Sequence, residues 1–181
     1  MASTVVLVEG RSDQAALEAL AARQSRDLGA EGVAVIRMGG AHAIGRFLER
    51  YGPQGLGLRL AGLCDAGEEP DFRRALERVG LGADVGRDGM ETFGFFVCDI
   101  DLEDELTRAL GPEAVERVIA DQGELASFRT FQKQLEKRSL SREEQLRGFM
   151  WNRKIAYAPL LVDALDLERV PRPLRGLLAY V

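Results

Sequence analysis

The chain has 181 residues, of which 46% are hydrophobic and 29% are charged, and its formal net charge is −5. The length and hydrophobic content predict one compact domain, and the negative net charge argues against a protein that coats nucleic acid by bulk electrostatics. Two cysteines and one histidine do not supply the ligand set of a zinc site. There is no run of 18 apolar residues and no recognisable export signal, so we expect a cytoplasmic protein with no membrane partner.

Strand-like and helix-like segments alternate along the first 111 residues. Short β-branched runs predict the strands, and apolar residues at helical spacing predict the helices between them. The expected order is strand 4–8, helix 12–24, strand 33–37, helix 41–50, strand 58–64, helix 71–79, strand 93–98 and helix 102–110. This alternation predicts an α/β fold with a four-stranded, mainly parallel sheet flanked by helices.

From Pro112 onward the apolar spacing is helical and no further strand is predicted. The expected helices are 112–121, 124–137, 141–151, 153–166 and a short last one after Pro173. We therefore divide the chain into an α/β core, 1–111, and a C-terminal helical extension, 112–181.

Acidic residues recur where the predicted strands end. Glu9, Asp65 and Asp99 each follow a strand, at the edge where open α/β sheets bind ligands. A second acid follows each one four residues later, about one helical turn, so both can face the same point; these are Asp13, Glu69 and Glu103. Gathered carboxylates repel one another unless cations lie between them, and oxygen-only ligands suit Mg²⁺ or Mn²⁺. First-turn acids also suit a helix dipole, but their repetition at successive strand ends favours a metal site.

Basic residues concentrate late in the chain. Residues 122–154 carry 8 basic and 4 acidic side chains, whereas residues 1–121 carry 13 basic and 22 acidic ones. This asymmetry is compatible with a phosphate-facing surface beside an acidic pocket, and equally with a solvated helical face. The sequence contains no Walker-type, GxGxxG or GxSxG motif, which argues against a nucleotide-binding loop or a serine hydrolase.

The segments VLVEGRSD and LCDAGEE resemble a TOPRIM domain, the metal-binding fold of topoisomerases, bacterial primases and OLD-family nucleases. The usual pattern is a glutamate after the first strand, here Glu9, and a DxD after the third, here Asp65 with Gly67 in place of the second acid. The OLD (overcoming lysogenization defect) type is more similar, through Asp13, the run Asp101-Leu102-Glu103 and the late pair Arg153-Lys154. The resemblance spans Val5 to about Leu178. OLD proteins typically join an ABC-type ATPase to this module, so the chain looks like a free-standing module working with a separately encoded ATPase.

The resemblance implies a divalent-metal-dependent DNA endonuclease or nickase that uses two Mg²⁺ or Mn²⁺ ions. It implies that the core, 1–111, binds metal and that 112–181 completes the active site. Glu9 would be a metal ligand or general base, and Lys154 would stabilise the charge of the transition state. The implied metal ligands are Glu9, Asp13, Asp65, Asp101 and Glu103, with Asp99 as an alternative, and the implied DNA contacts are Arg147, Arg153 and Lys154.

Several alternatives stay open at this point. The sequence does not decide which of Asp99, Asp101 and Glu103 bind metal, or whether Glu68 or Glu69 compensates for Gly67. The chain could instead be a catalytically weak nucleic-acid-binding or regulatory subunit of an ATPase. It could also be another TOPRIM phosphoryl-transfer enzyme, such as an RNA-processing nuclease. The apolar helical tail could form a homodimer contact.

Overall fold

The computed structural model describes residues 2–81 and 86–181. Its sheet contains β1 (Thr4–Val8), β2 (Val33–Arg37), β3 (Arg59–Asp65) and β4 (Phe95–Cys98), in the spatial order β2-β1-β3-β4. Every neighbouring pair is parallel, which confirms the predicted four-stranded α/β fold. The carboxyl ends of all four strands therefore lie at one edge of the sheet.

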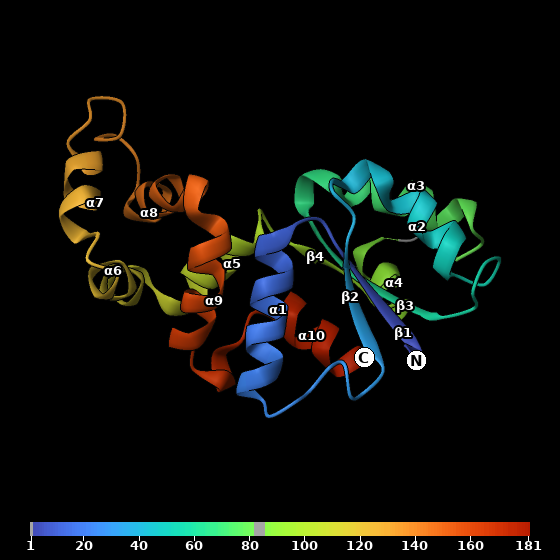
Figure 1. The fold of residues 1–181 in the computed structure, drawn as a ribbon. Helices are drawn as coiled ribbons and strands as arrows, with labels where there is room; N and C mark the ends of the chain where they lie inside the picture. The colour runs from blue at the N-terminus through green and yellow to red at the C-terminus, as the bar shows by residue number, and fades with distance from the viewer. Residues whose placement is uncertain (1, 82–85) are drawn as a thin grey trace.

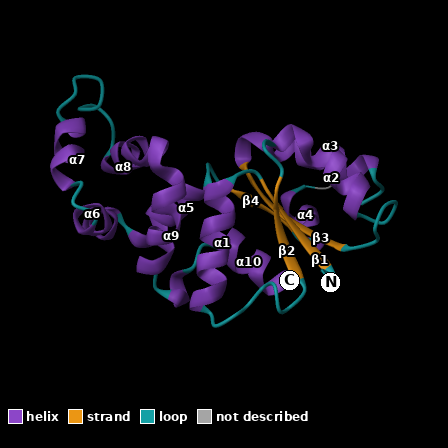
Figure 2. Ribbon diagram, in the orientation of Figure 1, coloured by secondary structure: helices purple, strands orange, loops and turns teal. Residues whose placement is uncertain are grey.

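Helices cover both faces of this sheet (Figures 1 and 2). The helices of the first half are α1 (Arg11–Arg23), α2 (Ile44–Tyr51), α3 (Glu69–Arg78), α4 (Arg87–Thr92) and α5 (Leu102–Leu110). Side chains alternate across the strands, so Val6 and Val8 pack into one core while Val5 and Leu7 pack into another with α2 and α3. Because each face buries its own core, only the edges of the sheet remain available to a ligand.

The second half is helical, as predicted. It contains α6 (Pro112–Asp121), α7 (Leu125–Gln132), α8 (Arg142–Met150), α9 (Lys154–Ala164) and α10 (Arg172–Tyr180). Helices α6, α7 and α8 lie away from the sheet, whereas α9 packs along α1 (Figure 1). Among the described residues, no helix has the length and apolar character that a membrane crossing requires.

Helix α10 lies against β3 and β4, and one glycine permits its close approach. A Cβ atom at Gly176 would clash with the ring of Phe96 on β4. Arg23 of α1 and Arg26 of the turn after it hold the ends of the last two helices. Arg26 donates to the carbonyls of Leu178 and Val181 at the end of α10. Arg23 donates to the carbonyls of Val162 and Leu165, at 2.6 and 2.7 Å. The last two helices are thus tied to the sheet and to α1.

Two details differ from the sequence predictions. Helix α4 was not predicted, and its sequence, RDGMET, is short and contains a glycine. The helix predicted at 124–137 was wrong in its last part, because α7 ends at Gln132 and turns follow. Leu135 is 85% exposed, so no apolar contact extends the helix beyond that point.

Candidate metal centre

The carboxyl edge of the sheet brings together a set of acids that we call the cleft acids: Glu9, Asp13, Asp65, Glu68 and Glu103. They line a cleft of about 590 Å³, together with the loop glycines Gly39 and Gly40 and the side chains of Trp151 and Lys154. Glu9 directly follows β1, Asp65 is the last residue of β3, and the first turns of α1 and α5 supply Asp13 and Glu103. The sheet edge and two helix starts thus place acids from distant parts of the chain around one hollow.

Three of the cleft acids are close enough to share one cation. Glu9, Asp65 and Glu68 each offer a carboxylate oxygen, and these oxygens lie within 4.8 Å of one another. Glu68 lies in a single 3-10 turn, Ala66–Glu68, between β3 and α3. Gly67 is exposed, and a Cβ atom at this position would meet nothing within 4 Å. The acid that joins Asp65 in the cluster is therefore the residue after Gly67.

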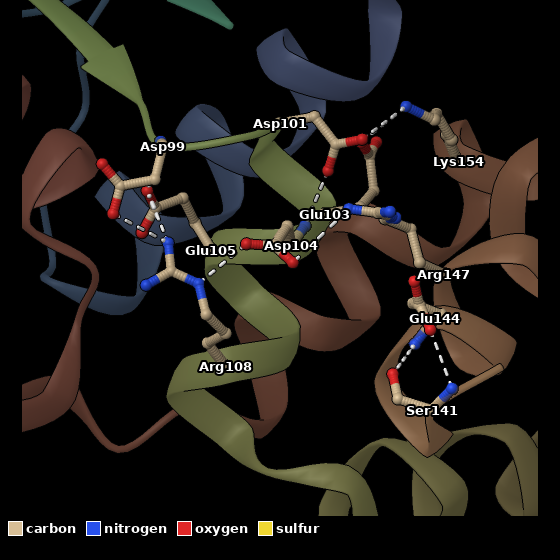
Figure 3. Close-up of polar contacts among 10 residues, drawn as sticks. All are labelled: Asp99, Asp101, Glu103, Asp104, Glu105, Arg108, Ser141, Glu144, Arg147 and Lys154. Atoms are coloured by element: carbon tan, nitrogen blue, oxygen red, sulfur yellow. Dashed lines mark hydrogen bonds and ion pairs between the residues drawn. The ribbon is translucent and has the colours of Figure 1, made fainter. Parts of the chain in front are cut away.

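The other two cleft acids are held by defined contacts. Asp13 Oδ2 accepts a hydrogen bond from the backbone N–H of Gly10 at 2.8 Å, which fixes it at the start of α1. Glu103 Oε2 accepts from Lys154 Nζ at 2.8 Å, across 51 residues of sequence. Figure 3 shows Lys154 reaching from α9 toward Asp101 and Glu103 at the start of α5.

Burial and mutual repulsion raise the pKa values of four of the cleft acids. Burial, followed by the charges of Asp13, Asp101 and Glu103, raises the pKa of Asp65 to about 7. Burial and the facing carboxyl group of Glu9 raise the pKa of Glu68 to about 8. Burial likewise raises the pKa of Asp13 and of Glu103, although the hydrogen bond from Lys154 acts against it at Glu103. The cluster is therefore short of positive charge.

Lys154 is the basic side chain that faces the cleft acids most directly. Burial lowers its pKa, but the hydrogen bond to Glu103 and the charges of Glu103 and Asp101 outweigh this, so the pKa of Lys154 is raised overall. The ammonium group stays charged at neutral pH. It is 3.8 Å from Asp101 and also lies over the ring of Trp151, 4.4 Å from its centroid.

A second set of acids, which we call the paired acids, lies nearby but faces arginines: Glu69, Asp99, Asp104 and Glu105. Arg87 of α4 contacts Glu69 at 2.7 Å and Asp99 at 3.2 Å. Arg108 contacts Asp99, Asp104 and Glu105 at 2.7 to 3.3 Å (Figure 3). Glu69 and Asp99, both considered as metal ligands from the sequence, thus have protein cations of their own.

The remaining predicted residues lie around the cleft rather than in it. Asp101 is buried and caps α5, where its side chain accepts from the Asp104 N–H at 2.8 Å. Arg147 approaches Asp104 at 3.6 Å (Figure 3). Arg153 contacts Glu124 at 3.3 Å in an adjoining groove. Their assignment to metal or DNA stays a prediction. The sequence suggested Glu68 only as a substitute for an acid at position 67, because the placement of Glu68 depends on the turn after β3.

The donor set fits a hard divalent cation. All the cleft acids offer carboxylate oxygens, the ligand type that Mg²⁺ and Mn²⁺ prefer. Glu68 Oε2 and Glu103 Oε1 are buried and have no hydrogen-bond partner within the part of the chain that the structure describes. Buried carboxylate oxygens without a partner are costly unless a cation contacts them. The cleft therefore has both the chemistry and the unfilled acceptors of a metal site.

Comparisons with known proteins find a matching family model and similar solved structures. Residues 1–66 match the family model for the overcoming lysogenization defect protein-like TOPRIM domain. The C-terminal region of the Burkholderia pseudomallei OLD protein superimposes with a TM-score of 0.76 and 22% identity, covering 99% of this chain and 96% of that one. The C-terminal region of the Xanthomonas campestris pv. campestris OLD protein also gives 0.76 and 22%, covering 99% and 92%. No curated protein sequence matches the chain significantly.

The family match covers β1, α1, β2, α2 and β3, and so includes Glu9, Asp13 and Asp65. The structural matches extend the likeness of fold over almost the whole chain, including the helices after Pro112. Residues 1–66 thus resemble the OLD-like TOPRIM family, and the chain as a whole has the fold of the C-terminal region of OLD proteins.

Proposed function

We propose that this protein is a divalent-metal-dependent nuclease that cleaves phosphodiester bonds in DNA by a two-metal mechanism. The observation that carries the proposal is the cluster of Glu9, Asp65 and Glu68, whose oxygens lie within 4.8 Å of one another at the carboxyl edge of the sheet. The OLD-like TOPRIM match supports it, because that domain indicates a nuclease-type phosphoryl-transfer family.

Within this proposal, Glu9, Asp65 and Glu68 hold one ion, and Asp13 and Glu103 offer oxygens for the second. When bound, Mg²⁺ or Mn²⁺ supplies Lewis acidity toward the phosphodiester and the attacking water. Metal binding requires the carboxylates to be deprotonated. Since burial raises the pKa values of Asp65 and Glu68 to about 7 and about 8, we expect metal affinity to increase as pH rises through that range.

Lys154 contributes a fixed positive charge beside the cluster. Glu103 orients the ammonium group through the 2.8 Å hydrogen bond, and the start of α9 supports it. A cation held in this way stabilises negative charge that develops on a phosphoryl group in the transition state. Removing one such donor from an enzyme typically costs about 10² to 10³ in rate.

The direct test is cleavage of supercoiled plasmid in Mg²⁺ and, separately, in Mn²⁺. We expect nicking or linearisation with either metal, none in EDTA, and its loss in Glu9→Ala. Lys154→Met should lower the rate by about 10² to 10³. Asp99→Asn is the matched control, because Asp99 is also a strand-end acid but pairs with Arg87 and Arg108.

Titration calorimetry with Mn²⁺ separates the alternatives. A protein that binds Mn²⁺ through Glu9 but cleaves no DNA, and that binds DNA equally well as Glu9→Ala, would be a regulatory subunit instead. Preference for structured RNA over plasmid would indicate an RNA-processing enzyme. A separately encoded ATPase partner and a homodimer contact stay predictions, to be tested by co-purification and by light scattering.

A further inference from the structure

A second hollow adjoins the metal centre, and we call it the groove. It has a volume of about 730 Å³ and shares Ser12, Trp151 and Lys154 with the cleft. Its walls come from the first turns of α1 and α9 and from the turn between α6 and α7. Ligand sites commonly have volumes of roughly 300 to 1,000 Å³. The groove is therefore large enough for a nucleotide placed directly beside the cleft acids.

Trp151, the single tryptophan of the chain, stands where the cleft and the groove meet. It is 60% exposed, and the other large exposed apolar residues in the described part of the chain are aliphatic. Lys154 Nζ lies over one face of the ring, 4.4 Å from the centroid. With 60% of the residue exposed, much of the indole is accessible to a ligand. An indole face beside a cation is the kind of surface on which nucleobases stack.

The groove also carries positive charge, although the chain as a whole is acidic. Arg11, Arg153 and Lys154 line it. Glu124 is the acid in its wall, and that carboxylate is already engaged by Arg153 at 3.3 Å and by the hydroxyl of Tyr157 at 3.0 Å. The remaining charge complements a phosphate backbone that continues from the metal centre.

We propose that the groove binds an unpaired nucleotide of DNA, with its base stacked on Trp151, so that the substrate is single-stranded at the position next to the cleaved bond. The choice of DNA rests on the proposed function. A base within a duplex has neighbours on both faces, so stacking on Trp151 requires an unpaired base. In this proposal the junction between α8 and α9 selects single-stranded over double-stranded DNA, whereas the cleft carries out the cleavage.

Because the chain has a single tryptophan, its fluorescence reports directly on whether a base stacks on Trp151. In EDTA, where no cleavage occurs, we expect a short single-stranded DNA oligonucleotide to quench the fluorescence of Trp151 saturably. The same oligonucleotide annealed to its complement should quench it far less. By fluorescence anisotropy with labelled DNA, Trp151→Ala should weaken single-strand binding by about 5- to 150-fold, the usual range for one stacked base, and Trp151→Phe should retain most of the affinity.

Leu135→Ala is the control, since it removes an exposed apolar side chain from the α7–α8 connection. Thermal melting verifies that each variant folds. Equal quenching by single-stranded and duplex DNA, tighter binding of the matching RNA, or unchanged affinity in Trp151→Ala would overturn the inference. Absent quenching with intact metal-dependent cleavage would count against the groove alone. Quenching without cleavage would count against the proposed nuclease alone.

Discussion

The cleft acids and the paired acids come from adjacent positions in the sequence but meet different surroundings. Glu68 faces Glu9 and Asp65, whereas its neighbour Glu69 contacts Arg87 at 2.7 Å. Glu103 faces the cleft, whereas its neighbour Asp104 contacts Arg108 at 2.7 Å. One set is neutralised by arginines of the protein, and the other has Lys154 as its near cation. Strand-end acids are therefore candidates for a metal site where the fold places no arginine beside them.

This comparison also explains the direction of the pKa shifts in the cleft. Among the paired acids, arginines of the chain supply positive charge, and Arg108 lies 3.0 Å from the buried Glu105. In the cleft, burial and repulsion dominate, and the pKa values of Asp65 and Glu68 rise to about 7 and about 8. Near neutral pH, Asp65 and Glu68 therefore take up either protons or a metal ion.

The largest expected contrast is between two strand-end aspartates. Asp65→Asn should lower metal-dependent cleavage by more than about 100-fold, since even residues that only support metal ligands cost about 10- to 100-fold. Asp99→Asn should change the rate by less than about twofold, as exposed substitutions usually alter free energies by no more than about 0.5 kcal/mol. Initial rates of plasmid nicking in Mn²⁺ measure both. Equal losses in the two variants would break the distinction between the two sets of acids.

A smaller effect concerns stability in the absence of metal. Asp65 and Glu68 bind protons more tightly when folded than when unfolded, where their pKa values are 3.8 and 4.5. The stabilisation is thus fully present below about pH 4 and is lost as pH rises through about 7 to 8. Solvent screens these half-buried groups, so we expect a loss on the order of 1–3 kcal/mol.

Urea unfolding in EDTA between about pH 5.5 and 8.5 tests this window. Saturating Mn²⁺ should restore the stability at the higher pH, because the cation replaces the lost protons. The double variant Asp65→Asn, Glu68→Gln should show a much shallower profile, because only Asp13 and Glu103 then keep a raised pKa in the cleft. A metal-free stability that increased over this range would contradict the assignment of the cleft acids as uncompensated.

The smallest expected effect is at Gly67, where the family pattern has a second aspartate. A Cβ atom there meets nothing within 4 Å, so Gly67→Asp should change the free energy of unfolding by no more than about 0.5 kcal/mol. Because Glu68 supplies the carboxylate at the cluster, Mn²⁺ affinity measured by calorimetry should also change by no more than about twofold. Recovery of metal binding when Gly67→Asp is added to Glu68→Gln would show instead that position 67 reaches the ion.

The sheet was predictable because its signals are local. The run Thr4–Val8 is fully buried and is followed by an acid and a glycine, and β3 and β4 likewise run into an acid. Helix α4 lacks such a signal, and its contacts with β4 arise only in the folded chain. The same applies to the end of α7, where the sequence continues in polar residues and the apolar contacts stop at Phe131.

The acids of the site were predictable as candidates but not as a set. Strand ends and first turns placed Glu9, Asp13 and Asp65 at one edge, as the structure has them. The alternatives after β3 and β4 depended on tertiary contacts. Arg87, on the unpredicted helix α4, forms an ion pair with Glu69. Asp99, before the start of α5, contacts Arg108 rather than the cleft. The family resemblance singled out Lys154 and Glu103 separately, but their contact was not predicted, because no local pattern joins residues 51 positions apart.

The tie between Arg23 and the carboxyl end of α9 has a mechanical consequence. Helices α1 and α9 lie side by side and both begin at the cleft, so they run in the same direction (Figure 1). Arg23 links their far ends through the carbonyls of Val162 and Leu165. A slip of α9 by one residue, about 1.5 Å, would displace the backbone of Lys154 by about half the length of its 2.8 Å hydrogen bond to Glu103. The position of Lys154 relative to the acids is therefore fixed partly at the opposite end of the two helices. The guanidinium group of Arg23, about three helical turns from the cleft, sets it.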